Sequence, residues 1–197
     1  AAATIIRELG GFASQETLDL MRLMGRTNSY AEERDYVEYI QAADPRRLPG
    51  EVNAVINAGL ASGKLRANDT FVSDAKKQAT ERIAADKASL PSYERDARKA
   101  SATEATVTGA ADALLSYGEP ANAEELYTIA LGKPGADMPR VLTRLGIAQV
   151  DQGKYAAAQE TFAKVTGKRQ PIARLWSSYA ASKVMPTPAP ATAAATQ

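Results

Sequence analysis

The feature that most constrains this chain is a set of residues that recurs at one fixed spacing in its C-terminal half. Gly118 and Gly153 lie 35 positions apart (153 − 118 = 35), and other residues recur at the same offset. The recurring pairs are Gly118 with Gly153, Ala123 with Ala158, Tyr127 with Phe162, Ala130 with Val165, Gly132 with Gly167 and Lys133 with Lys168. A structural unit that is used twice in succession produces such a spacing.

Residues 139–167 predict the structure of one such unit. Apolar residues recur at helical spacing on both sides of Gly153, which indicates two short amphipathic helices joined by a tight turn. Gly153 is expected to supply the left-handed backbone that ends the first helix. Where the helices of a hairpin cross, small Ala158 leaves room for Phe162, and Ala123 leaves room for Tyr127.

The residues Leu145-Gly146, Gly153, Tyr155, Ala158 and Phe162 together resemble the tetratricopeptide repeat (TPR), a helical hairpin of roughly 34 residues. The resemblance implies an all-α fold in which antiparallel helical hairpins are stacked as a TPR-like right-handed α-solenoid. Stacked hairpins need an end unit with a polar outer side. Residues 171–185 are expected to form this C-terminal capping helix, in which Trp176 closes the last repeat.

We expect three regions along the chain. Residues 1–100 form a divergent helical-repeat region, residues 101–185 a two-repeat TPR-like region with the capping helix, and residues 186–197 an extended tail rich in Pro, Ala and Thr. In the first region, helices are expected near residues 14–25, 30–43, 49–63 and 70–90, followed by a loop at 91–100 that contains Pro91. A capping box from Ser101 to Glu104 is expected to start the next helix.

Composition excludes several kinds of site. The 197 residues include neither Cys nor His, which rules out disulfides, thiolate nucleophiles, imidazole catalysis and the usual zinc sites. The 24 basic and 23 acidic residues give a formal net charge of +1, so overall charge does not favour binding to nucleic acid. No apolar run approaches the roughly 18 to 20 residues of a membrane span. Because no metal or cofactor motif is present either, no metal and no cofactor are expected.

The resemblance also implies a concave groove that binds a partner. Its lining would be Thr108, Asp112, Leu115, Arg140, Thr143, Arg144, Ile147, Ser178 and Tyr179. Arg140 and Arg144 fall where chaperone-binding members of the family hold the C-terminal carboxylate of a peptide, although the preceding repeat lacks the other residues of that clamp. Reversing both charges is expected to weaken binding of an acidic peptide and to leave the helices intact. The alternatives are a solvated charged face, and packing of Leu115 and Ile147 against a neighbouring helix.

Together these features favour a scaffold without catalytic activity that binds another protein, as a peptide or a helix, in a bacterial envelope or cytoplasmic assembly. The small residues Ala-Ala-Ala-Thr at the start resemble the product of signal cleavage, which favours a periplasmic or envelope location. Two alternatives stay open. One is a solenoid domain that acts on glycans with carboxylates alone or assists such an enzyme, which requires a buried acid of raised pKa in a cleft. The other is a structural module that self-associates into a homo-oligomer.

Overall fold

The computed structural model describes residues 2–9 and 11–184, and regular secondary structure in these ranges is helical throughout. The α-helices are α1 (Ala2–Leu9), α2 (Ser14–Arg26), α3 (Glu33–Ala43), α4 (Pro49–Ala61), α5 (Thr70–Ala97), α6 (Glu104–Ser116), α7 (Pro120–Leu131), α8 (Met138–Asp151), α9 (Tyr155–Ala163) and α10 (Gln170–Val184). One 3₁₀ turn, η1 (Gly167–Arg169), precedes α10. The all-α class expected from the sequence is therefore confirmed. The tail predicted for residues 186–197 lies outside the described residues.

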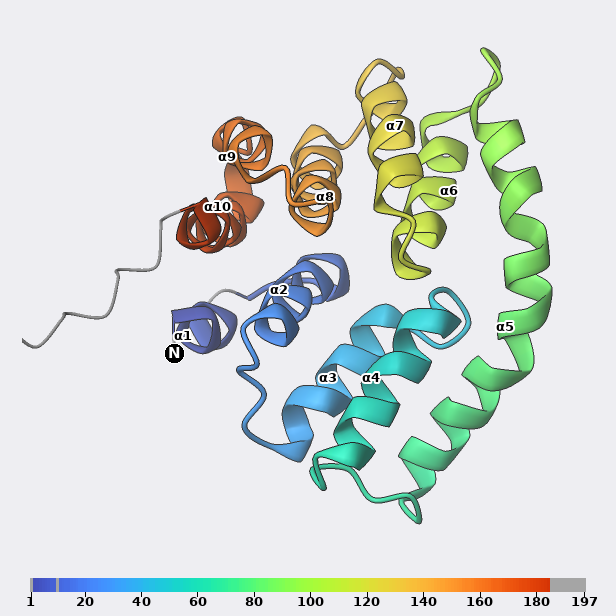
Figure 1. The fold of residues 1–197 in the computed structure, drawn as a ribbon, viewed down its shortest axis with the longest axis vertical. Helices are drawn as coiled ribbons and strands as arrows, with labels where there is room; N and C mark the ends of the chain where they lie inside the picture. The colour runs from blue at the N-terminus through green and yellow to red at the C-terminus, as the bar shows by residue number, and fades with distance from the viewer. Residues whose placement is uncertain (1, 10, 185–197) are drawn as a thin grey trace, which may run out of the picture.

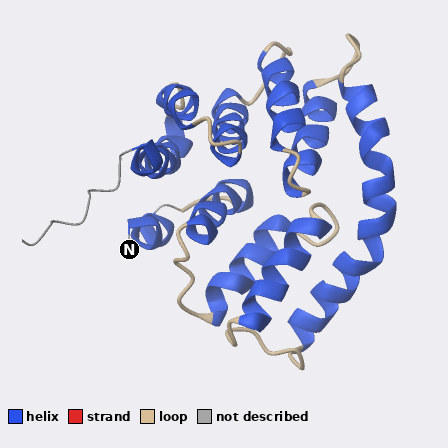
Figure 2. Cartoon of the chain, in the orientation of Figure 1, coloured by secondary structure: helices blue, strands red, loops and turns tan. Residues whose placement is uncertain are grey.

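Each helix packs against the next one along the chain, and the row of helices curls back on itself (Figure 1). Loops and turns connect the helices (Figure 2). Helix α1 contacts α2 and α10, and α2 also contacts α8 and α10. The first two helices therefore close the curve against the last ones, with α2 on its inner side (Figure 1).

The same kind of turn ends α2, α4, α6 and α8. Its central residues, Asn28, Gly63, Gly118 and Gly153, have positive φ angles of 50°, 69°, 78° and 75°. At Gly153, its own N–H donates to the Val150 carbonyl, and the next N–H donates to the Gln149 carbonyl, both at 2.9 Å. The other three turns have the same pair of bonds, which is the Schellman arrangement. The expected equivalence of Gly118 and Gly153 is thus confirmed.

The turn residues extend the 35-residue spacing into the N-terminal half. Asn28 and Gly63 are 35 positions apart (63 − 28 = 35), as Gly118 and Gly153 are. Gly63 and Gly118 are 55 apart (118 − 63 = 55), which is 20 positions more (55 − 35 = 20). Most of the extra length lies in α5, which has 28 residues where α7 has 12. One elongated helix therefore interrupts an otherwise regular series of hairpins.

The packing of small residues beside aromatic rings agrees with the predicted register. Ala123 and Ala158 are fully buried, as is Tyr127, and Phe162 is almost so. A Cβ on Gly146 would lie only 2.6 Å from Cζ of Phe162, so the helix needs glycine at that point. One of the recurring pairs is not equivalent, because Gly167 has a φ of +67° whereas Gly132 ends α7 with a φ of −89°.

Two hydrophobic clusters form the core of the described residues. One holds residues of α3, α4 and the start of α5, and the other holds residues of α6 to α10 with the end of α5. Helix α2 contributes to both, with Leu18, Met21 and Met24 in the first cluster and Leu20 and Leu23 in the second. A division at residue 100 follows the clusters only in part, because α2 and α5 connect them.

The prediction of a loop at residues 91–100 is wrong for most of that range, because α5 continues through Pro91 to Ala97. Leu90 and Ala97 are buried against the second cluster, and this burial offsets the one hydrogen bond that Pro91 cannot donate. The expected capping box at Ser101 is also wrong by two residues. Thr103 caps α6 instead, since its Oγ1 accepts a 3.2 Å hydrogen bond from the N–H of Thr106.

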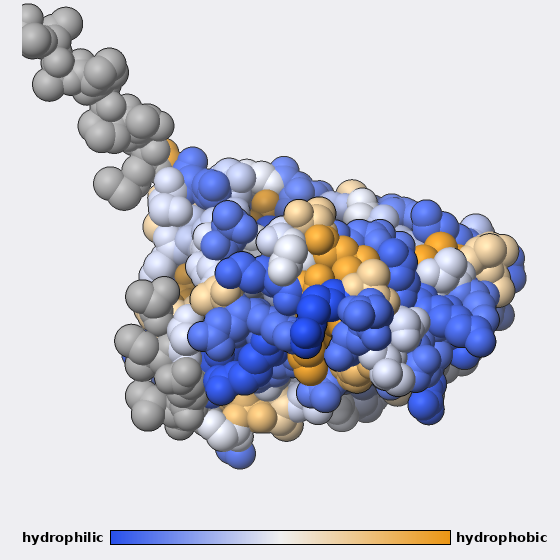
Figure 3. Space-filling view, turned by 90° about the horizontal axis from the view of Figure 1, so that it is seen from below, coloured by the Kyte–Doolittle hydropathy of each residue, from blue (hydrophilic) through white to orange (hydrophobic). Residues whose placement is uncertain are grey.

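None of the helices described is both long enough and apolar enough to cross a membrane. The face in Figure 3 is mostly hydrophilic, and apolar side chains appear there as a limited patch.

Candidate functional site

Helix α2 covers the surface that the resemblance assigns to a binding groove. Every residue of α8 from 141 to 150 is buried, including polar Thr143, Arg144 and Gln149. A groove-lining helix would leave one face open to solvent. Here α7 and α9 flank α8, and α2 and α10 also contact it. The inner face of α8 is therefore occupied by the chain itself.

A buried aspartate of α2 holds the helix in this position. Asp19 accepts hydrogen bonds from Nε of Arg144 at 3.1 Å, from Nη1 of Arg22 at 3.2 Å and from Arg169. The indole N–H of Trp176 donates to the Asp19 carbonyl at 2.9 Å. Burial raises the pKa of Asp19, but the three arginines outweigh it and hold the pKa below its usual value. Asp19 thus stays ionised and ties α2 to α8 and α10.

A second buried carboxylate completes the network. Asp112 accepts from Nη1 of Arg144 at 2.5 Å, from Nη2 of Arg140 at 2.8 Å and from the hydroxyl of Tyr127 at 2.6 Å. Burial raises the pKa of Asp112, but Arg144 and Arg140 outweigh it and hold the pKa at about 2. Arg140 donates to Asp112, and Arg144 donates to both Asp112 and Asp19. Both of these carboxylates are side chains of this protein itself.

This finding corrects one expectation. Reversing the charges of Arg140 and Arg144 would place new carboxylates beside Asp112 and Asp19 in a buried site. Since unpaired buried charges are strongly destabilising, the double reversal is expected to disrupt the fold.

The remaining groove residues expected from the sequence are divided between several places. Thr108 and Thr143 are buried and donate to carbonyls of their own helices. Ser178 is exposed and donates to the Arg174 carbonyl, and Tyr179 packs edge-on against Trp176. Both lie on α10, away from the cavity described next. Leu115 and Ile147 line that cavity, although each is largely buried.

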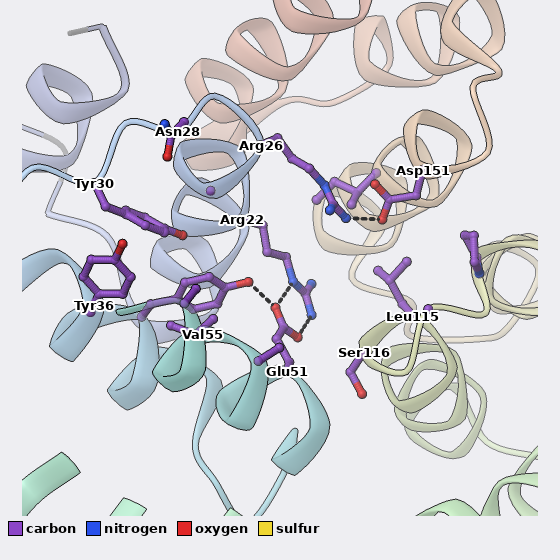
Figure 4. Close-up of a pocket in the computed structure, with 17 residues that line it drawn as sticks. Arg22, Arg26, Asn28, Tyr30, Tyr36, Glu51, Val55, Leu115, Ser116 and Asp151 are labelled. Atoms are coloured by element: carbon purple, nitrogen blue, oxygen red, sulfur yellow. Dashed lines mark hydrogen bonds and ion pairs between the residues drawn. The ribbon is translucent and has the colours of Figure 1, made fainter. Parts of the chain in front are cut away.

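A cavity of about 590 Å³ lies between α2 to α4 and the helices α6 and α8 (Figure 4). Its walls are lined by Arg22, Gly25, Arg26, Asn28, Tyr30, Tyr36, Tyr39, Glu51, Ala54, Val55, Ala58, Leu115, Ser116, Gly118, Pro120, Ile147 and Asp151. Both halves of the chain contribute, so the cavity exists only when the curve is closed.

Three tyrosines form one wall of the cavity. The ring of Tyr30 lies 4.9 Å from that of Tyr36 and 6.1 Å from that of Tyr39, measured between centroids. The Tyr30 hydroxyl donates to the Met21 carbonyl at 2.5 Å. Burial raises the pKa of Tyr39 above its usual value, and the nearby charge of Glu51 adds to this. Tyr39 therefore stays neutral, and the three rings together present an aromatic surface to the cavity.

The two carboxylates of the cavity differ in their environment. Glu51 accepts from Nε and Nη2 of Arg22, both at 2.7 Å, and from the Tyr39 hydroxyl at 2.5 Å. Burial raises its pKa, but Arg22 outweighs this and lowers it. Asp151 accepts from Nη2 of Arg26 at 2.7 Å, across the gap between α8 and α2 (Figure 4). Burial raises the pKa of Asp151 in spite of this arginine.

Sequence reasoning missed Asp19, Arg22, Glu51, Asp151 and the tyrosine wall as parts of a site. One signal was present, because Asp19 and Arg22 interrupt the apolar run of α2 at buried positions. Within residues 2–9 and 11–184, no group of three or more acidic side chains is placed to hold a metal ion.

No protein-family model matches this chain, and no curated protein or solved structure is significantly similar to it. The class of protein is thus defined by its own geometry, as an all-helical chain that closes on itself around a cavity shared by both halves.

Proposed function

We propose that this protein is a non-catalytic helical-repeat scaffold that binds a segment of another protein in the cavity between α2–α4 and α6–α8. The same proposal assigns the helices to a TPR-like right-handed α-solenoid with α10 as its cap. The cavity carries the proposal, because its lining combines apolar and aromatic side chains with the charged side chains of Arg22, Arg26, Glu51 and Asp151. Surfaces of this kind suit an extended peptide or a partner helix.

A substitution that fills the cavity with a large side chain tests whether the partner binds there. Ala54 lines it and is exposed, so Ala54→Trp should occupy the space without disturbing the buried clusters. Ala84→Trp on the exposed middle of α5 is the matched control. Partners captured by the unmodified protein and identified by mass spectrometry should be lost with Ala54→Trp and kept with Ala84→Trp. Equal capture by both variants would exclude the cavity as the binding site.

A second candidate function is favoured by Asp151, a largely buried acid of raised pKa in a cleft. Glycan hydrolysis needs such a group as its acid and a free carboxylate nearby. Glu51 is the other carboxylate of the cavity, but both of its oxygens already accept hydrogen bonds. Release of reducing ends from peptidoglycan or chitin oligomers, abolished by Asp151→Asn, would establish this function in place of the scaffold.

A further inference from the structure

The two carboxylates of the cavity are not equally available to a ligand. Both oxygens of Glu51 accept hydrogen bonds from Arg22, and one of them also accepts from Tyr39. Asp151 has one ion-pair partner among the described residues, Arg26, which contacts Oδ2 alone. A ligand that enters the cavity can therefore change the pairing of Asp151 more readily than that of Glu51.

The Arg26–Asp151 pair is asymmetric. The Asp151 side chain is 16% exposed, whereas that of Arg26 is 49% exposed and reaches in from α2 (Figure 4). An exposed arginine is solvated by water once it leaves an ion pair, so release costs Arg26 itself little. The carboxylate that stays behind is poorly solvated, and it needs another cation. The pair thus favours replacement of one arginine by another positive group.

The surroundings of Asp151 suit the rest of such a ligand. Ile147, one helical turn before Asp151 on α8, and Leu115 on α6 line the cavity beside it, and Tyr30 and Val55 line the far wall. An aliphatic stem can lie along such walls while its charged end reaches the carboxylate. The planar arginine head group also matches a carboxylate with two parallel donors, and Oδ1 of Asp151 is available for the second.

Resting on the proposed function, we infer that the cavity selects an extended peptide with an arginine or lysine side chain, which replaces Arg26 on Asp151 while its apolar neighbours contact the cavity walls.

A phage-displayed library of random linear peptides, selected on the full chain, tests this inference. Enriched peptides should carry a basic residue at one fixed position next to apolar residues. One enriched peptide and its Arg→Gln version are then titrated against the protein by fluorescence polarisation. The Arg→Gln peptide should bind at least about tenfold more weakly.

Variants of the protein give effects of opposite sign. Asp151→Asn should lower the affinity for the peptide by about tenfold or more, because the buried partner of the cation is lost. Arg26→Ala should raise the affinity for the peptide by about two- to fivefold, because the competing arginine is gone. Lys154→Ala is the matched control. It removes a base that is 50% exposed from a carboxylate, Glu124, that is 19% exposed, at 2.6 Å and outside the cavity lining. No change is expected there.

The outcomes distinguish a wrong peptide preference from a cavity that binds no peptide. Two results would overturn the inference while the proposed scaffold function stands. In one, peptides whose binding is blocked by Ala54→Trp lack a basic residue. In the other, their affinity is unchanged by Asp151→Asn. A selection that enriches no peptide, or only peptides unaffected by Ala54→Trp, overturns the cavity as a binding site and the inference with it.

Discussion

Single buried charges control how this molecule responds to substitution. Asp19 on α2 and Asp112 on α6 lie among Arg22, Arg140, Arg144 and Arg169, and both keep pKa values below the usual range. Such carboxylates stabilise the fold while ionised, because each one neutralises arginines that would otherwise be buried without a partner.

Asp112→Asn is expected to cost about 3 to 5 kcal/mol at pH 7, since it leaves Arg144 and Arg140 with an uncompensated charge. The Asp112 pKa is about 2 in the folded state, below the ordinary 3.8, so its contribution is present above pH 3.8 and is lost as pH falls towards 2. Urea unfolding should therefore show a large difference from the unmodified protein at pH 7 and a small one at pH 2. Asp96→Asn is the control, because Asp96 pairs with Lys99 at the surface. An equal loss at both pH values would contradict this assignment.

Asp151 should behave in the opposite way. Its pKa is raised by burial, so the charged form opposes folding and the protonated form is favoured in the folded state. Asp151→Asn is expected to be at least as stable as the unmodified protein at pH 7, and its relative advantage should shrink as pH falls through the raised pKa. Thermal unfolding at several pH values measures this. Lower stability of the variant at pH 7 would show that the pairing with Arg26 outweighs the burial.

The packing of Ala158 gives a third test at this scale. Ala158 is fully buried in α9, and Phe162 one turn later fills the space against Gly146. Ala158→Leu is expected to overpack the hairpin and to cost about 1 to 3 kcal/mol. Ala156→Leu, at an exposed position of the same helix, should change the unfolding midpoint little. Equal midpoints for the two variants would place Ala158 outside the helix interface.

At the scale of the helices, the positive-φ turns determine where each hairpin bends. Gly153→Ala is expected to cost about 1 to 2 kcal/mol, because φ is +75° there and a side chain strains that conformation. Gly109→Ala should instead stabilise the protein by about 0.5 to 1 kcal/mol, since Gly109 lies inside α6 with open space around it. Chemical denaturation of both variants checks the opposite signs. A stabilising Gly153→Ala would exclude a strained turn.

Sequence reasoning predicted the helical class, the last two hairpins and the final helix, because glycine turns and small residues beside large ones leave a local pattern. It did not extend the same spacing to the N-terminal half. There Asn28 takes the place of glycine, and α5 adds residues that hide the period. It also predicted an open groove, since the position of α2 depends on contacts such as Asp19 with Arg144, which are 125 positions apart. No local pattern reports a contact of that range.

At the scale of the whole molecule, the two hydrophobic clusters share α2 and α5 and should unfold together. The single tryptophan, Trp176, bonds to Asp19 and therefore reports whether α2 is in place. We expect its fluorescence and the far-ultraviolet circular dichroism to change at one urea midpoint. Two separate midpoints would mean that the clusters are independent, and the cavity between them would then be adjustable.

The contact between α1 and α10 also bears on how the gene can be rearranged. Since α1 and α10 touch, a flexible linker could join α10 to α1, and the chain could be opened at the Gly135 loop between α7 and α8. Such a circular permutant should retain the same helices around the cavity, because the order of synthesis would change while every packed neighbour stayed in reach.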